Sequence, residues 1–307
     1  MRFDFLEKHY LLGASERTLA MLFTLTTLFG TIDQSRVHLI DAYPRGTGAH
    51  NFIFRGNNPT TTVNGTTVFD YDTLVSSMRL AANKECNVTL PSTFRIVDVD
   101  LENLSDPGYF VEHQYWKKNP DKGEVLQWTT LGSALDVKVT PNRDSWVKNG
   151  TWAIQGKADQ LPERLATLHA ALLNATDPPT VFFVHCNAGC DRTGEFIGAY
   201  AMSYLKYNIT TAMGEASKQC GRTPNFFASE SLGWWCLTLT AQGRTDMGNC
   251  LDAFGVRAAP DPSTCGSSPP LTASLTLVGR VSRPQCKYLG DCDTHGATPL
   301  ADACPRA

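Results

Sequence analysis

The sequence predicts an α/β domain with a central, mostly parallel sheet, helices on both faces and a Cys-rich tail. Short apolar stretches of β-favouring residues alternate along the chain with segments of helical periodicity, which is the order of parallel βαβ units. The stretch at 180–184 is apolar throughout, as a strand buried on both faces would be. The 307 residues, 42% of them hydrophobic, suffice for one ordinary domain with terminal extensions. We place this domain at residues 34–248.

The order of the elements follows from the spacing of apolar residues. One helical stripe is formed by Tyr71, Leu74, Val75 and Met78, and a second by Leu161, Leu165, Leu168 and Leu172. Residues 103–150 are polar and are expected to be irregular apart from two candidate strands. The expected elements are, in order, a strand at 51–56, a helix within 70–83, a strand at 94–99, candidate strands at 124–130 and 135–140, a helix at 160–174, a strand at 180–184, and helices at 194–206 and about 225–241.

The residues that follow the strand at 180–184 combine a nucleophile with groups that bind phosphate. They read His-Cys-Asn-Ala-Gly-Cys-Asp-Arg-Thr-Gly over positions 185–194. A strand-to-helix turn here would direct the N–H groups of residues 187–192 inward at a helix N-terminus, which favours negative charge. The guanidinium of Arg192 can bind two oxygens of a phosphate, and the same positive field would stabilise the thiolate of Cys186. These features predict a phosphate-ester hydrolase that works through a phosphocysteine.

The same ten residues resemble the signature loop of the cysteine-dependent protein tyrosine and dual-specificity phosphatases. That loop reads His-Cys, five residues, Arg, Thr or Ser, Gly, and its fixed positions are present here as His185, Cys186, Gly189, Arg192, Thr193 and Gly194. The resemblance covers roughly residues 50–240 and implies the fold and the phosphate monoester hydrolysis of that superfamily. The alternative is a buried structural cysteine in an ordinary strand-helix turn.

The resemblance assigns roles within the loop. Cys186 would attack phosphorus, and Arg192 would stabilise the charge that develops on the phosphoryl oxygens. Substrate-binding residues would be Asn187, Ala188, Gly189, Cys190 and Thr193. The hydroxyl of Thr193 would donate to the sulfur of Cys186, cap the following helix, or do both. His185 would either orient the loop or only pack at the end of its strand.

Three aspartates are candidates for the general acid. Asp191 ranks first, because an Asp-Arg-Thr sequence at this place resembles that of the myotubularin and bacterial secreted lipid and tyrosine phosphatases. Asp159 ranks second, because it lies nearest to the usual distance before the cysteine, although it could instead cap the helix at 160–174. Asp144 ranks third and lies further upstream.

Cys190 is a second thiol in the same turn. We expect it either to protect Cys186 through a reversible disulfide or to fill space as a small residue.

The loop and the composition also limit substrates and cofactors. The loop contains no lysine, whereas the phosphoinositide phosphatases of the family that it resembles commonly have lysines there. The resemblance therefore implies phosphotyrosine in proteins, or a small phosphate ester, as the substrate. Phosphoinositides or inositol phosphates, which the Asp-Arg-Thr ending favours, are the second candidate substrates. A catalytically idle phosphate-binding module is the alternative of a different class. We expect no cofactor and no metal in the reaction, because no histidine or carboxylate cluster suitable for a two-metal site is evident in the sequence. A net charge of −3 argues against a nucleic-acid partner.

Several features predict passage through the secretory pathway. Residues 1–33 contain an apolar stretch that suits a signal peptide or a signal anchor, and the chain would contact a membrane only if this segment stays uncleaved. Residues 249–307 form a tail rich in Cys, Pro and Ser. Outside the loop, eight cysteines are expected to form disulfides: Cys86, Cys220, Cys236, Cys250, Cys265, Cys286, Cys292 and Cys304. Acceptor triplets for N-glycosylation begin at Asn64, Asn87, Asn103, Asn149, Asn174 and Asn208.

Overall fold

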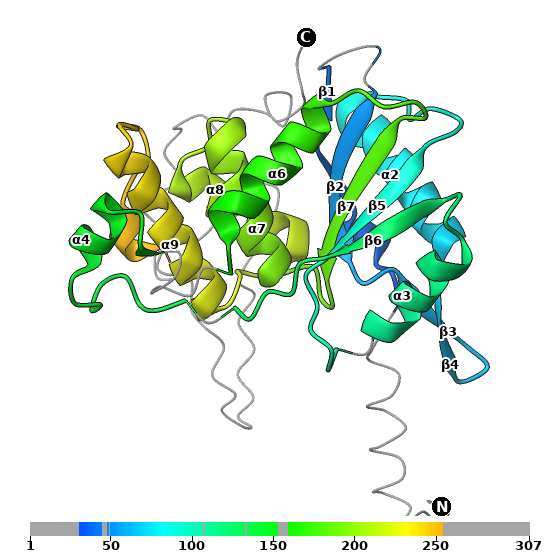
Figure 1. Cartoon of the computed structure of the whole chain (residues 1–307), viewed down its shortest axis with the longest axis horizontal. Helices are drawn as coiled ribbons and strands as arrows, with labels where there is room; N and C mark the ends of the chain where they lie inside the picture. The colour runs from blue at the N-terminus through cyan, green and yellow to red at the C-terminus, as the bar shows by residue number, and fades with distance from the viewer. Residues whose placement is uncertain are drawn as a thin grey trace, which may run out of the picture.

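The computed structural model describes residues 31–44, 48, 50–106, 108–132, 134–152 and 159–253. A five-stranded sheet lies at its centre, in the order β1-β2-β7-β5-β6 (Figure 1). Only β1 runs antiparallel to its neighbour; the other three pairs are parallel. The predicted mostly parallel α/β sheet is therefore confirmed. The strands are β1 (His38–Tyr43), β2 (Asn51–Asn57), β5 (Arg95–Asp100), β6 (Gly123–Gln127) and β7 (Thr180–Cys186).

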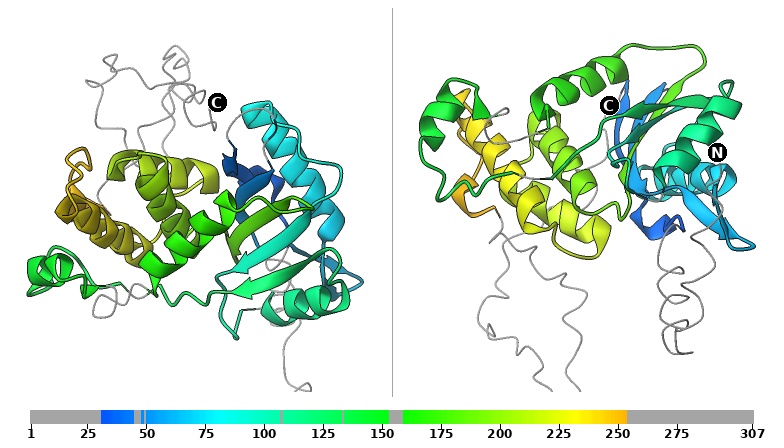
Figure 2. Two further views of the ribbon diagram at one scale, coloured as in Figure 1. Left: turned by 45° about the horizontal axis from the view of Figure 1, so that its top comes forward. Right: turned by 60° about the horizontal axis from the view of Figure 1, so that its bottom comes forward.

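Helices cover both faces of this sheet, and Figure 2 shows the two groups from further directions. One face carries α2 (Tyr71–Cys86) and α3 (Tyr109–Lys118). The other carries α6 (Leu161–Leu173), α7 (Arg192–Tyr204), α8 (Ile209–Cys220) and α9 (Phe226–Ala241). The short elements are the hairpin β3 (Thr60–Val63) and β4 (Thr66–Phe69), the helix α4 (Arg143–Lys148), and the 3-10 turns η1 (Gln34–Arg36) and η2 (Cys250–Asp252).

The apolar residues of β7 explain why this strand lies at the centre. All seven of its residues are buried. Val181 and Phe183 pack into the core on the α2 side, and Phe182 and Val184 pack into the core on the α6–α9 side. A strand that is apolar on both faces is stable only between two layers of helices, so β7 lies between β2 and β5.

Most of the predicted elements are present, within a few residues at each end. The predicted strand at 135–140 is wrong. Its alternating Leu135, Val137 and Val139 imitate a strand, but only Val137 is buried. The Asp136 carboxylate accepts a hydrogen bond from the backbone N–H of Lys138, which closes a turn in place of a ladder.

The region 103–150 is more regular than its polar composition predicts, since α3, β6 and α4 lie within it. The sequence analysis also omitted β1, the β3–β4 hairpin and α8. Helix α8 begins at Asn208, whose side chain accepts a hydrogen bond from the backbone N–H of Thr211. An asparagine before a helical segment is a common N-cap, so Asn208 could have indicated where this helix begins. The sequence analysis considered Asn208 only as a glycosylation acceptor.

Both predicted extensions lie mostly outside the described residues. This applies to the apolar segment within residues 1–33 up to Gly30, and to the tail from residue 254 onwards. Residues 249–253 are described and pack against α9. Among the described residues, no helix is long and apolar enough to cross a membrane.

Two disulfides are present in the described part of the chain. Cys236 in α9 is bonded to Cys250 in η2. Both belong to the eight cysteines that the sequence analysis expected to form disulfides. Cys190 is bonded to Cys220. The sequence analysis placed Cys190 outside the set of disulfide-forming cysteines, as a thiol of the loop, and this prediction was wrong.

The Cys236–Cys250 bond closes a loop with a sequence separation of 14 residues. We predict that the double substitution Cys236→Ala and Cys250→Ala lowers the free energy of unfolding by about 3 kcal/mol, because a loop of this length loses its restraint in the unfolded chain. Urea denaturation followed by circular dichroism, without reductant, measures the difference. A decrease of less than about 1 kcal/mol would contradict the prediction.

Candidate active site

Cys186 is the last residue of β7, and Arg192 is the first residue of α7. Residues 187–191 therefore form a tight loop at the carboxyl end of the central strand, where open α/β sheets bind ligands. Cys186 is 2% exposed and is the free cysteine of the described residues. Its sulfur therefore forms no disulfide, although the loop contains a second cysteine.

The carbonyl groups at the start of this loop are held from outside. The Asn187 carbonyl accepts a hydrogen bond from the backbone N–H of Asn58, at 3.2 Å. The Ala188 carbonyl accepts one from Arg36 Nη1, at 2.7 Å. The Gly189 carbonyl accepts one from Arg55 Nη2. Three consecutive carbonyl oxygens are thus bound by donors from η1, β2 and the residue that follows β2.

The backbone N–H groups of the loop are mostly free. Those of residues 187, 188 and 190–193 donate no hydrogen bond to any described residue. The N–H of Gly189 is the exception, because it donates to the carbonyl of Cys186 at 3.1 Å. The N–H groups expected to bind an anion are therefore free of partners among the described residues at 187, 188 and 190–192, but not at 189. Free amides at a helix N-terminus form a cradle for an anion.

Gly189 is required by this close packing. Its φ is +67°, and a Cβ at this position would lie 2.4 Å from the carbonyl oxygen of Gly56. Any side chain would therefore collide with the backbone of β2.

Arg55 holds the loop through the Gly189 carbonyl, and the sequence analysis did not single it out as a site residue. It is fully buried, and it also donates from Nη1 to Gln219 Oε1 at 2.9 Å. Burial lowers the pKa of Arg55 to about 10, while the electrostatic interaction with Cys186 opposes that decrease. An arginine in an otherwise apolar strand was the available signal, because a buried guanidinium needs a specific partner.

Arg192 is oriented by Asp106, another residue that the sequence analysis omitted. Arg192 Nη1 lies 2.6 Å from Asp106 Oδ2 and 3.1 Å from the Leu101 carbonyl. Its Nε and Nη2 donate no hydrogen bond to a described residue, so they remain available for a ligand. Burial lowers the pKa of Arg192, but the charges of Cys186 and Asp106 outweigh it and raise that pKa above the usual value.

Asp191 forms an ion pair that conflicts with the role of general acid. Its two oxygens lie 2.8 and 2.6 Å from Arg222 Nη1 and Nη2, and Oδ1 also accepts from the backbone N–H of Asn225. Burial raises the pKa of Asp191, but these hydrogen bonds and the charges of Arg222 and Arg192 bring it below the usual value. This ion pair favours the ionised form of Asp191, whereas a general acid must carry a proton.

The other two candidates for the general acid differ in their surroundings. Asp159 lines a small cavity together with Arg192, and its Oδ2 accepts hydrogen bonds from the backbone N–H groups of Leu131 and Gly132. It does not cap α6, whose N-cap residue is Gln160. Asp144 has an 82% exposed side chain that pairs with Arg143. Of the three aspartates, Asp159 is the one that borders Arg192 without an ion-pair partner of its own among the described residues.

The expected bridge between Cys190 and Cys186 is wrong. Cys190 forms a disulfide with Cys220 at the C-terminal end of α8, so its sulfur cannot serve as a resolving thiol. The bond joins the loop to a helix that the sequence analysis did not predict, and no spacing rule indicated this pair.

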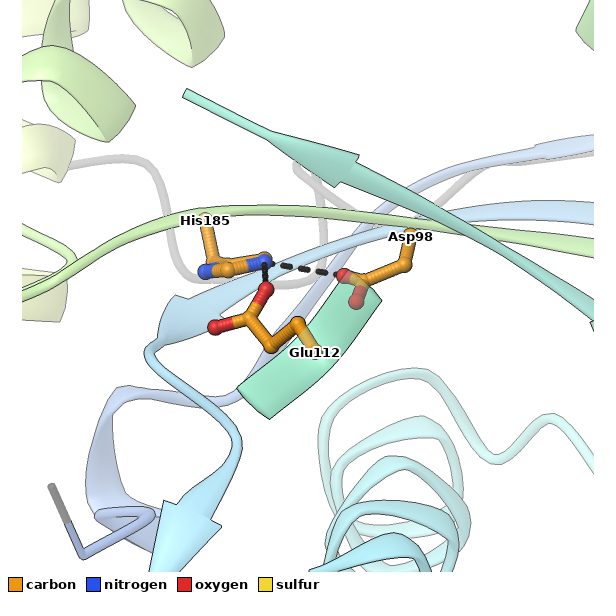
Figure 3. Close-up of side chains that lie close together, drawn as sticks. All are labelled: Asp98, Glu112 and His185. Atoms are coloured by element: carbon orange, nitrogen blue, oxygen red, sulfur yellow. Dashed lines mark ion pairs between the residues drawn. The ribbon is translucent and has the colours of Figure 1, made fainter. Parts of the chain in front are cut away.

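Thr193 and His185 differ from their expected contacts. Thr193 Oγ1 is buried and has no hydrogen-bond partner among the described residues, so it neither binds the Cys186 sulfur nor caps α7. His185 is fully buried between Asp98 of β5 and Glu112 of α3 (Figure 3). Its role is more than packing, because it faces two carboxyl groups directly.

Burial also affects the acidic residues beside His185. It raises the pKa of Glu102 to about 7, and it raises the pKa of Glu112 well above its usual value. These groups lie behind the loop.

Comparison with known proteins finds only distant similarity. No protein-family model matches the chain, and no curated protein matches its sequence. Among solved structures, the chain is similar to a mutant form of Tk-PTP at 17% identity and a TM-score of 0.38, over 68% of this chain and 99% of that one. It is similar to TpbA of P. aeruginosa, solved in complex with pTyr, at 14% identity and a TM-score of 0.36, over 70% and 97%.

It is also similar to PTPMT1, at 18% identity and a TM-score of 0.33, over 68% of this chain and 99% of that one. These three structures are of cysteine-dependent protein tyrosine phosphatases, the family that the loop sequence resembles.

Glu195 gives a prediction on the pH dependence of stability. It is fully buried in α7, where Ser231 Oγ donates to its Oε1 at 2.6 Å, and burial raises its pKa from 4.5 to about 8. Between these two pH values the folded protein retains a proton that the unfolded chain has released. The free energy of unfolding should therefore fall as pH rises, by up to about 1.4 kcal/mol per pH unit from this group.

Glu195→Gln should remove this contribution, so the variant gains stability relative to the wild type as pH rises from 4.5 to 8. Urea denaturation of both proteins across this range measures the difference, in which the other titrating groups cancel. A difference that does not change with pH would contradict the raised pKa.

Proposed function

We propose that this protein hydrolyses phosphate monoesters through a phosphocysteine on Cys186. The observation that carries the proposal is the loop itself. A free thiol stands beside six unpaired backbone N–H groups, at residues 187, 188 and 190–193, and beside the two free nitrogens of the Arg192 guanidinium. This set of donors matches the oxygens of a phosphoryl group and stabilises the charge they carry in the transition state. A cysteine with a purely structural role would need none of these groups.

Three arginines interact electrostatically with Cys186: Arg55, Arg192 and Arg222. This positive charge supports the proposal, because both the nucleophile and the phosphate group of such a reaction are anions.

The reaction would take place in two displacements. The sulfur of Cys186 attacks phosphorus and forms the S–P bond, while the P–O ester bond breaks and its electron pair goes to the leaving oxygen. That oxygen takes a proton from the general acid. Water then attacks the phosphocysteine and gives a proton to the resulting carboxylate, and the S–P bond breaks to release phosphate and the thiolate.

We assign the general acid to Asp159. It shares a cavity wall with Arg192, and its Oδ1 accepts no hydrogen bond from a described residue. The two backbone N–H groups on Oδ2 hold the carboxyl group in place. Asp191 cannot offer a proton readily, because its ion pair with Arg222 favours the ionised form.

The proposed substrate is phosphotyrosine in proteins rather than a phosphoinositide or an inositol phosphate. A substrate with several phosphates needs cationic groups that are free at the site. Here Arg55 is buried, Arg222 pairs with Asp191, and Arg36 binds both Asp33 and the Ala188 carbonyl. The described surroundings of the loop thus leave one main phosphate-binding guanidinium, that of Arg192.

We also propose that the protein passes through the secretory pathway. The two disulfides of the described residues support this, because such bonds persist in oxidising compartments. The six acceptor asparagines also support it, since none of them is buried. They lie in turns, at helix ends or in loops, where a glycan can be attached.

The first test of this function is substitution in the loop. Cys186→Ser should lower the hydrolysis of an aryl phosphate at least about a thousandfold, because the nucleophile is lost. Arg192→Lys should lower it by about 10² to 10³, because an ammonium group cannot bind two oxygens in one plane. Phosphate release measures both effects.

Two results would contradict the mechanism. Hydrolysis that persists in Cys186→Ser would exclude the phosphocysteine. Absence of turnover by the wild type at every pH, together with intact binding of phosphotyrosine, would favour the idle phosphate-binding module.

The second test separates the candidate acids. Asp159→Asn should slow alkyl or phenolic phosphates with poor leaving groups by about 10² to 10⁴, and should slow an activated aryl phosphate much less. Asp191→Asn and Asp144→Asn are the matched controls, and neither should depend on the leaving group. A selective effect of Asp191→Asn instead would restore the first-ranked candidate of the sequence analysis.

A further inference from the structure

A group of acidic side chains surrounds His185 behind the loop. Nε2 of His185 lies 2.9 Å from Asp98 Oδ1 and 3.2 Å from Glu112 Oε2, and all three side chains are fully buried. Figure 3 shows Nε2 directed toward both carboxyl groups, which come from β5 and α3. These three atoms lie within 4.8 Å of one another.

Both contacts of His185 are ion-pair contacts rather than well-formed hydrogen bonds. Asp98 Oδ1, Glu112 Oε2 and His185 Nε2 are all without a hydrogen-bond partner among the described residues. Three polar atoms that converge in a fully buried place without hydrogen bonds are costly, unless another group lies between them.

Each carboxyl group of the cluster is satisfied on one oxygen only. Asp98 Oδ2 accepts from Trp116 Nε1, at 2.7 Å, and Glu112 Oε1 accepts from Asn58 Nδ2, at 2.8 Å. These hydrogen bonds hold the two carboxyl groups so that the unpaired oxygens turn toward His185. The hydrogen-bonded oxygens thus resemble the outer contacts that orient metal ligands.

Two further carboxyl groups lie beside the cluster. Asp100 and Glu102 are buried, and each has one oxygen without a hydrogen-bond partner among the described residues.

We propose that Asp98, Glu112 and His185 bind one divalent transition-metal ion, such as Mn²⁺, Fe²⁺ or Zn²⁺. Two carboxylates and one imidazole are a donor set that these ions share. Metal–ligand bonds of about 2.0–2.2 Å place neighbouring donors roughly 3 Å apart, which agrees with the separations of 2.9 and 3.2 Å.

The ion would have a structural role. His185 is followed directly by Cys186, so a metal bond to its imidazole would fix the end of β7, where the loop begins. The ion would lie behind the loop and would not contact the reacting phosphate. The proposed hydrolysis therefore remains independent of metal in its chemical steps.

Metal analysis of the full chain tests this proposal. The protein is purified without a chelator or a histidine tag from cells supplied with Mn²⁺, Fe²⁺ and Zn²⁺, and its metal content is measured by mass spectrometry. We expect about one ion per chain. Asp98→Asn and Glu112→Gln should weaken binding by more than about 100-fold. Glu195→Gln is the matched control, because it changes a buried carboxyl group outside the cluster and should retain the ion.

A measurement on the unsubstituted cluster covers the case in which these variants fail to fold. Co²⁺ added to metal-free wild type should produce visible absorption bands from oxygen and nitrogen ligands, without the near-ultraviolet band of a cobalt–sulfur bond. The same spectrum should appear with Cys186→Ser. A cobalt–sulfur band would place the metal on Cys186 and would overturn the proposal.

Two further results would overturn it. One is a metal content that Asp98→Asn and Glu112→Gln leave unchanged. The other is a folded wild type that contains no ion after incubation with Mn²⁺, Zn²⁺ or Co²⁺, which would mean that the carboxyl groups and His185 share protons instead.

Discussion

The conformation of the loop after Cys186 depends on where its carbonyl groups point. The carbonyls of residues 187–189 accept hydrogen bonds from Asn58, Arg36 and Arg55, all on the outer side of the loop. With these carbonyls bound elsewhere, the N–H groups of residues 187, 188 and 190–193 donate to no described residue. Donors on β2, on η1 and in the residue after β2 thus fix the carbonyl side of the loop.

The sequence predicted the parts of this site that depend on local order. An apolar strand, a cysteine and a glycine-containing turn before a helix define the loop without knowledge of its surroundings. The parts that it could not predict come from distant segments. Arg55 and Asp106 act on the loop across more than eighty residues of sequence, and only the parallel pairing of β2 and β5 with β7 brings them close. Pairing of parallel strands leaves no short-range pattern in a sequence.

The choice of general acid shows a related limit. Asp191 ranked first because the Asp-Arg-Thr sequence resembles that of certain phosphatases, but a short motif does not reveal the partner of a carboxyl group. Arg222 lies thirty-one residues further on and binds Asp191 through both oxygens. The same applies to Cys190, whose partner Cys220 is at the end of a helix that polar residues concealed. In both cases the contact that decides the role comes from the segment around the end of α8.

The disulfide between Cys190 and Cys220 has a consequence for the environment in which this protein can work. One loop contains a sulfur that must remain reduced, on Cys186, and another that is oxidised, on Cys190. A strong soluble reductant preserves the first and threatens the second, whereas a strong oxidant does the reverse. Cys190 and Cys220 are 1% and 5% exposed, so small thiols reach their bond only when the fold opens. Cys186 is 2% exposed and is equally buried, so the closed fold shields both kinds of sulfur, and a compartment of intermediate redox potential can maintain both at once.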